Sequence, residues 1–184
     1  RRLSPICFWN KWPWNPFNFC DYIQELMYNY KKSYTVDEAL SKLQKYCSYQ
    51  DRCHKEVEQK LKEMRMISEA SDQIIMALID GDYLNEERFA LAFVRGKFKI
   101  KKWGRHRLTS ELKQRNISKY LIDKALKQIP EAAYKATFES LAHKKVASIT
   151  GASAFKKKKK LADYLLYRGW ESSMVYEKVN QVFK

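Results

Sequence analysis

The most chemically distinctive segment of the sequence is a basic stretch at residues 95–107. It contains seven Lys or Arg side chains and no acidic one. A face that only meets solvent usually mixes both signs of charge, so this segment predicts contact with a polyanion whose phosphates the cations neutralise. The cations are Arg95, Lys97, Lys99, Lys101, Lys102, Arg105 and Arg107. All but Arg95 are expected to line one exposed basic surface, with Lys101, Lys102 and Arg105 at outward positions on helix ends.

Three large apolar side chains, Phe98, Ile100 and Trp103, are interleaved with these cations. They could stack on bases, as aromatic side chains do in proteins that bind single-stranded nucleic acid. The alternative is structural. Phe98 and Ile100 would then pack in the core, and Trp103, beside Gly104 in an inter-helix turn, would act as a packing wedge. We include Trp103 among the candidate residues for binding.

A second basic block is a run of five lysines, Lys156, Lys157, Lys158, Lys159 and Lys160. Five consecutive residues of a helix point to all of its sides, so they cannot all face one partner. The block is a candidate contact for DNA or protein. The alternative is a helix end that only increases solubility.

Residues that could support catalysis or hold a metal are scattered. His54, His106 and His143 lie far apart and lack the Glu spacing of a metal-binding helix. The acidic pair around Gly81 is too short for a calcium loop and is typical of a helix end followed by a turn. No nucleophile has an adjacent base, and no Gly-rich phosphate loop occurs. The sequence therefore predicts a binding protein rather than an enzyme, with no cofactor.

Composition indicates a globular helical protein. The chain has 184 residues, a net charge of +15 and 45% hydrophobic residues, and its five Gly and four Pro are too few for the turns of a β-sandwich or barrel. It has no Cys-x-x-Cys pair, no apolar run of bilayer length and no secretory signal, and Cys47 and Cys53 are typical of small buried residues. We expect a cytoplasmic monomer with reduced thiols.

Residues 1–34 are predicted to be an N-terminal extension that is weakly ordered or lies upstream of the natural start. Residues 1–26 hold three of the five Trp and three of the four Pro, and Met27 directly precedes the first patterned segment. One hypothesis is that the natural start is Met27 and that residues 1–26 are upstream sequence or weakly ordered. The alternative is an aromatic docking peptide. The intact mass of the protein from its native host distinguishes the two.

From Thr35 onward the spacing of apolar residues is helical throughout. Thr35 and Glu38 form a capping box that begins the first helix, and Asn85 and Ser118 are expected to cap later ones. Residues 97–101 alternate like a strand, but the helical stripe continues through them in phase, which favours helix. Nine helices are expected. The apolar positions of the first seven lie within 40–47, 53–64, 74–79, 89–100, 108–112, 122–129 and 134–141. The eighth helix follows a loop around Gly151 and ends at Arg168, and the apolar positions of the ninth lie within 175–182.

One turn recurs three times, at residues 61–66, 112–117 and 165–170, with spacings of 51 and 53 residues. Each copy has a Leu, a helix end, a turn residue and an apolar residue, and the turn residues Arg65, Asn116 and Gly169 need a left-handed backbone. The leucines of the three copies, Leu61, Leu112 and Leu165, are expected to be buried. The recurrence indicates a tandem repeat of a three-helix unit. The predicted repeats are residues 35–82, 83–129 and 130–184. Because such repeats contact mainly their neighbours, we expect an elongated, curved all-α molecule.

Three segments resemble the RecX family of bacterial recombination regulators. Residues 46–57 resemble the first-repeat region of the family, and residues 85–97 resemble its most distinctive motif, here Asn-Glu-Glu-Arg-Phe-Ala-Leu-Ala-Phe-Val-Arg-Gly-Lys. Trp103-Gly104-Arg105, leading to Glu111-Leu112, is similar to the segment that follows. The similarity covers about residues 35–184.

The resemblance implies a function that composition does not reach. Proteins of this family bind the RecA recombinase, chiefly along the groove of its filament on single-stranded DNA. They generally inhibit strand exchange, ATP hydrolysis and the coprotease role in the SOS response, and so regulate DNA repair and recombination without enzymatic activity of their own. A second hypothesis is a stand-alone DNA-binding protein that uses residues 104–115 as a recognition helix, although no dimer element is evident.

Overall fold

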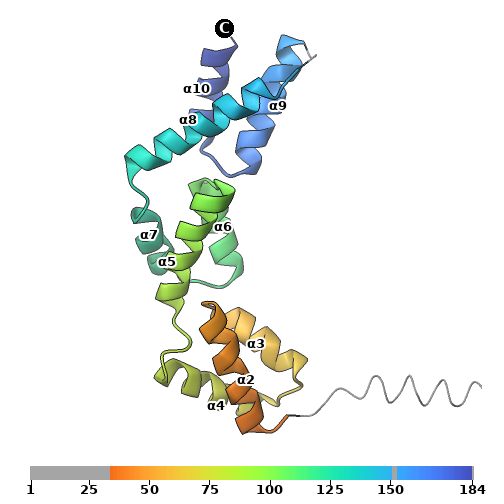
Figure 1. Ribbon diagram of the computed structural model, residues 1–184, viewed down its shortest axis with the longest axis vertical. Helices are drawn as coiled ribbons and strands as arrows, with labels where there is room; N and C mark the ends of the chain where they lie inside the picture. Colours follow the sequence, from red (N-terminus) through yellow and green to blue (C-terminus); the bar gives the residue numbers. More distant parts are fainter. Residues whose placement is uncertain (1–33, 151–152, 184) are drawn as a thin grey trace, which may run out of the picture. The chain divides into compact units, whose positions relative to one another are not determined.

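The structure is a computed structural model that describes residues 34–150 and 153–183. The two hypotheses about residues 1–26 and Met27, and the loop residue Gly151, lie outside the described residues. Residues 35–184 form one compact unit, whose described part is helical and contains no strand (Figure 1). The prediction of an all-α repeat fold is confirmed.

The helices follow one another along the chain with short connections (Figure 1). They are α2 (Val36–Tyr49), α3 (His54–Glu63), α4 (Ser68–Asp80), α5 (Glu86–Gly96), the π-helix η1 (Lys97–Lys101), α6 (Arg105–Gln114), α7 (Lys119–Lys127), α8 (Glu131–Ala147), α9 (Ala154–Tyr167) and α10 (Ser172–Val182). In the described ranges none of these helices is both long and apolar enough to cross a membrane.

Helix starts lie where the capping residues predict them. The N–H of Glu38 donates to Thr35 Oγ1 (3.3 Å), and the N–H of Thr35 donates to Glu38 Oε2 (3.2 Å), which completes the capping box of α2. The Asn85 side chain accepts from the N–H of Arg88 at the start of α5, and Ser118 accepts from the N–H of Leu121 at the start of α7. These side chains satisfy N–H groups that the first turn of a helix leaves without partners.

The segment at residues 97–101 is helical, as predicted, but it is a π-helix. Its hydrogen bonds reach one residue further than those of an α-helix, so side chains after Lys97 fall behind the α-helical phase. Ile100 is consequently 74% exposed, so the core-packing alternative is wrong for this residue. The π-helix ends at Lys102, which has the left-handed backbone (φ 55°).

The recurring turn has one geometry at all three sites. Arg65, Asn116 and Gly169 have φ values of 58°, 61° and 79°. In each copy the N–H of the following apolar residue donates to the carbonyl of the Leu five positions earlier, at 3.1 to 3.3 Å, which is the long hydrogen bond of a Schellman motif. Leu61, Leu112 and Leu165 are at most 1% exposed, which confirms that these positions are buried.

Buried apolar residues divide unequally along the array. One continuous core runs through α5 to α10, and among the described residues before α5 it includes only Cys53, which immediately precedes α3. Buried residues of α2 to α4, such as Leu43, Leu61 and Ile74, lie outside that core. We call α2–α4 the first group, α5–α7 with η1 the second and α8–α10 the third. The second and third groups therefore share a hydrophobic core that leaves out the buried residues of α2 to α4.

Candidate functional site

The basic stretch at residues 95–107 runs from the end of α5 through η1 and a turn into α6. The cations expected on one exposed surface do not lie on one, which corrects that prediction. Arg105 and Arg107 are held in the joint between α6 and the last three helices. The other cations belong to two separate hollows beside the α5–η1 helix, and these hollows share no lining residue.

Arg105 is not an outward-facing cation. Its Nη2 lies 2.6 Å from Glu131 Oε2, its Nη1 lies 3.8 Å from Glu171 Oε1, and its guanidinium sits 4.1 Å from the centroid of the Tyr134 ring. The hydrogen bond to Glu131 raises the pKa of Arg105 and lowers that of Glu131. The expectation that Arg105 takes an outward position on a helix end is therefore wrong.

Arg107 is also engaged within the chain. Its guanidinium lies between the rings of Trp103 (4.4 Å) and Tyr167 (4.6 Å), and its Nη1 donates to the carbonyl of Tyr167 at 2.9 Å. Trp103 is half-buried and also contacts the ring of Phe93. This geometry matches the packing-wedge alternative for Trp103 rather than a ring free to stack on a base.

A backbone joint connects the start of α6 to the end of α9. The N–H of Gly104 donates to the carbonyl of Arg168 (2.8 Å), and the N–H of His106 donates to the carbonyl of Gly169 (3.1 Å). The Arg168 side chain donates in turn to the carbonyl of Lys101. N–H groups at the start of α6 that have no partner within their own helix thus donate to carbonyls at the end of α9 that have none within theirs. Both helix dipoles favour this arrangement.

Tyr134 holds the same joint from inside. It is fully buried, its hydroxyl donates to Glu171 Oε2 (2.7 Å), and the N–H of Arg105 donates to the same hydroxyl (3.0 Å). Its ring lies between Phe98 and Trp170, at centroid distances of 5.9 and 4.5 Å. Burial, followed by the hydrogen bond to Glu171, raises the pKa of Tyr134 and keeps the hydroxyl a proton donor.

Replacing Tyr134 with Phe should lower the free energy of unfolding by about 1–3 kcal/mol, because it leaves the N–H of Arg105 without its partner. Urea unfolding followed by circular dichroism measures the decrease. Tyr49→Phe is the matched control, since Tyr49 is 87% exposed and should tolerate the change. Equal stability of the two variants would show that the buried hydroxyl contributes nothing.

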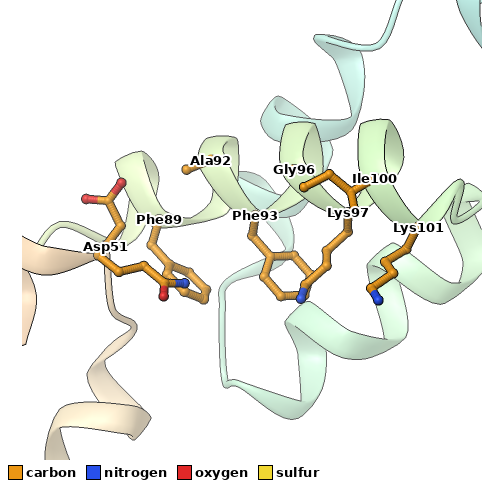
Figure 2. Close-up of a pocket in the computed structure, with 9 residues that line it drawn as sticks. Asp51, Phe89, Ala92, Phe93, Gly96, Lys97, Ile100 and Lys101 are labelled. Carbon is orange, nitrogen blue, oxygen red and sulfur yellow. The ribbon is translucent and has the colours of Figure 1, made fainter.

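The first hollow is a groove of about 340 Å³ along one face of α5 and η1, which we call the Phe93 groove. Figure 2 shows the rings of Phe89 and Phe93 side by side, with Asp51 at one end and Lys97 and Lys101 at the other. Ala92, Gly96 and Ile100 also line it. Lys97 Nζ lies 5.4 Å from the centroid of Phe93, so this cation contacts an aromatic face, whereas Lys101 is exposed.

The second hollow, of about 330 Å³, lies between α5–η1 on one side and α7, the following turn and α8 on the other. We call it the Arg95 pocket. Arg95, Lys99 and Lys102 line it, together with an apolar set and two polar uncharged side chains, Gln128 and Thr137. Among the residues that the structure describes, no acidic one lines it.

The lysine block occupies the first turns of α9. Lys156, Lys159 and Lys160 are exposed, and Lys157 and Lys158 are half-buried. Cations are unfavourable at the positive end of a helix dipole, so an anion near this end would relieve the repulsion. The block remains a candidate contact.

The described residues contain no group of three His, Cys, Asp or Glu side chains that could hold a metal ion. His54 and His143 each lie 3.6 Å from a glutamate one helical turn away. Cys47 and Cys53 are buried, as predicted, and burial raises the pKa of both thiols, which keeps them protonated and unreactive.

Sequence reasoning missed the long-range partners of the basic stretch. Glu131 and Glu171 follow Arg105 by 26 and 66 positions in the numbering, and no local pattern links them to it. One signal was available for the joint, because Gly104 and Gly169 both stand beside a helix end. That these two glycines face each other follows only from the folded chain.

Comparison with known proteins identifies relatives of both later helix groups. Residues 85–126 match the second three-helix domain of RecX, and residues 131–179 match the third. A crystal structure of a regulatory protein RecX superposes with a TM-score of 0.71 at 25% identity, covering 79% of this chain and 73% of the other. The RecX structure from Lactobacillus salivarius gives a TM-score of 0.67 at 24% identity, covering 80% and 96%.

Curated relatives agree with these matches. The regulatory protein RecX of Bacillus cytotoxicus is 25% identical over 153 residues, which are 83% of this chain and 55% of that protein. The RecX protein of Lactobacillus gasseri is 30% identical over 101 residues, 55% of this chain and 37% of its own length. The one from Chlorobium phaeobacteroides is 28% identical and is covered over 86% of its length. The chain thus spans about half the length of the Bacillus relative.

Proposed function

The chain belongs to the RecX family of regulatory proteins, and we propose that it regulates RecA by binding the RecA filament on single-stranded DNA. In this proposal it inhibits strand exchange, ATP hydrolysis and the coprotease role of the filament, and so limits recombination, DNA repair and the SOS response. It acts as a monomer in the cytoplasm and as a binding protein without catalysis. Relatives named as regulatory proteins support the general role.

The observation that carries the proposal is the set of unpartnered cations along α5–η1. The side chains of Arg95, Lys99, Lys101 and Lys102 make no ion pair or hydrogen bond within residues 34–150 and 153–183. Their neighbours Arg105 and Arg107 are fully engaged, so the free cations are not a general feature of the stretch. Like charges left unpaired on one helix repel each other, and a polyanionic partner such as a DNA–protein filament offsets that repulsion.

A stand-alone DNA-binding protein is the weaker candidate. In that hypothesis the helix within residues 104–115 would enter a DNA groove with its first residues forward. The start of α6 instead lies against the end of α9, and Leu108 and Leu112 are fully buried. These contacts favour a structural role for the helix.

Addition of the chain to preformed RecA filaments on single-stranded DNA should lower their rate of ATP hydrolysis. The decrease should persist when excess duplex DNA is present to absorb simple DNA binding. It should be larger at low salt, because screening of the cations is then weakest. Steady-state ATP hydrolysis by RecA measures the effect, and its disappearance in the presence of the duplex would favour the stand-alone DNA-binding hypothesis.

A matched pair of double variants links that inhibition to the α5–η1 cations. Lys101→Glu with Lys102→Glu should abolish inhibition, since both side chains lack partners and the fold does not depend on their charge. Lys156→Glu with Lys159→Glu changes the net charge equally and should have the smaller effect. Equal decreases in inhibition would show that this stretch acts only through the net charge of the protein.

A further inference from the structure

The Arg95 pocket combines two features that seldom occur together on a solvated surface. Three cations, Arg95, Lys99 and Lys102, stand around it, and they have no acidic neighbour in its lining. Its inner surface is apolar. That surface is formed by Leu91, Val94, Phe98, Ala125, Ile129 and Pro130.

The cations are not explained by structural needs of the chain alone. Lys99 and Lys102 lie near the end of the helix, where the dipole favours positive charge, but Arg95 lies before η1 begins. Arg95 and Lys99 are spaced i, i+4, a pairing that repels when the charges are alike. The three therefore concentrate positive charge at a hollow whose described lining holds no carboxylate to neutralise it.

The backbone at the rim of the pocket is held in an unusual conformation. Residues 97–101 form a π-helix, a form that appears often at functional sites. It ends at Lys102 with φ 55°, a left-handed conformation that is strained for a residue with a Cβ. Lys102 lines the pocket together with Lys99 and Arg95, so the local distortion and the charge cluster coincide.

The inner surface suits a flat, partly apolar group. Phe98 is half-buried and has its ring stacked on Tyr134, with an angle of 20° between the planes. Gln128 and Thr137 add an amide and a hydroxyl that could bond to the edge of a base. A volume of about 330 Å³ is at the small end of the range for ligand pockets and is suited to one small unit of a polymer.

We propose that the Arg95 pocket binds one nucleotide of a single-stranded nucleic acid, with the base on the apolar surface and the flanking phosphates against Arg95, Lys99 and Lys102. Single strands fit this chemistry because their bases are free to leave the stack, whereas those of a duplex are paired inside it. The inference deepens the proposed regulation of RecA filaments, because single-stranded DNA is the polymer of such filaments. It concerns the chain alone, without RecA.

The test is the binding of the full chain to a short fluorescein-labelled oligothymidylate, measured by fluorescence anisotropy over a range of salt concentrations. Arg95→Gln, Lys99→Gln and Lys102→Gln combined should weaken binding about tenfold or more. They should also reduce the logarithmic salt slope by about 0.7 for each phosphate that the variant no longer neutralises. The control, Lys156→Gln with Lys159→Gln and Lys160→Gln, removes the same charge from exposed positions. Equal weakening by both variants would overturn the proposal.

A second arm tests the base itself. An abasic strand of the same length and charge should bind the unmodified chain about tenfold more weakly, since it has no base to place on the apolar surface. Thr137→Phe, which fills the pocket without changing charge, should remove this difference. An abasic strand or a duplex that binds as tightly as oligothymidylate would overturn the proposal, as would the absence of any detectable binding.

The two levels of the proposal fail separately. If the oligothymidylate results are as expected and RecA is not inhibited, the proposed nucleotide pocket is supported and the proposed regulation of RecA is contradicted. If RecA is inhibited but the pocket variant and its control bind the strand equally well, the proposed regulation of RecA is supported and the proposed nucleotide pocket is contradicted.

Discussion

Replacing Gly169 with alanine should lower the free energy of unfolding by about 2–5 kcal/mol, because the change acts on both conformation and packing. Gly169 has φ 79°, where a side chain is strained. A Cβ at this position would also lie 2.3 Å from the N of Arg107 and 2.4 Å from its Cβ. The atoms in the way are backbone or next to it, so no side-chain rotation relieves the clash. Urea unfolding followed by circular dichroism measures the decrease.

Gly104→Ala separates the two causes. Gly104 has φ −78°, which any residue adopts, but a Cβ there would lie 2.3 Å from the carbonyl oxygen of Gly169. It should cost about 1–3 kcal/mol through packing alone. Gly96→Ala is the matched control, because a Cβ at Gly96 meets nothing within 4 Å and its helical backbone should gain about 0.5–1 kcal/mol. A neutral Gly169→Ala would mean that the joint does not need this close approach.

The glycine joint bears on function through the residues beside it. Lys101 accepts a hydrogen bond from Arg168 through its carbonyl, and Lys102 follows with its left-handed backbone. The joint therefore holds the end of η1, where the unpartnered cations lie. Loosening it should displace these cations without removing any of them.

Features set by neighbouring residues were predictable from the sequence. The Thr35 capping box, the Asn85 cap and the left-handed turns at Asn116 and Gly169 each depend on a few adjacent positions. Repetition of the turn at regular spacing then predicted the repeat architecture and the burial of Leu112. These signals are local, so one sequence suffices to detect them.

Features set by distant residues were not predictable. Charge alone placed Arg105 and Arg107 on the surface, but an arginine can reach a glutamate or an aromatic ring from another helix, and the folded chain supplies both. The apolar spacing of the sequence placed Ile100 on the same face as Phe93, but the π-helix turns its side chain to the surface. A basic stretch in a sequence therefore predicts a positive region, but which of its members are free depends on tertiary contacts.

The two joints between helix groups differ in chemistry. Between the first group and the second, polar contacts accompany the buried Cys53: Lys55 Nζ donates to the carbonyl of Gln114 (2.7 Å), and Arg88 Nε pairs with Asp51 (2.8 Å). Between the second and third groups, backbone hydrogen bonds and the rings around Tyr134 form a continuous core. Partly exposed ion pairs contribute little to stability, so the first group should unfold more independently than the other two.

Leu112→Ala tests that difference and should lower the free energy of unfolding by about 2–5 kcal/mol, because the side chain is fully buried and its removal leaves a cavity. Since Leu112 belongs to the core shared by α5 to α10, hydrogen exchange should accelerate throughout those helices. Leu61→Ala is the equivalent change in the first group, and its effect should stay within α2 to α4. Met76→Ala, at a 58% exposed position, is the control and should change stability by no more than about 0.5 kcal/mol. Faster exchange in α8 to α10 after Leu61→Ala would show that the polar joint couples the groups as strongly as the shared core does.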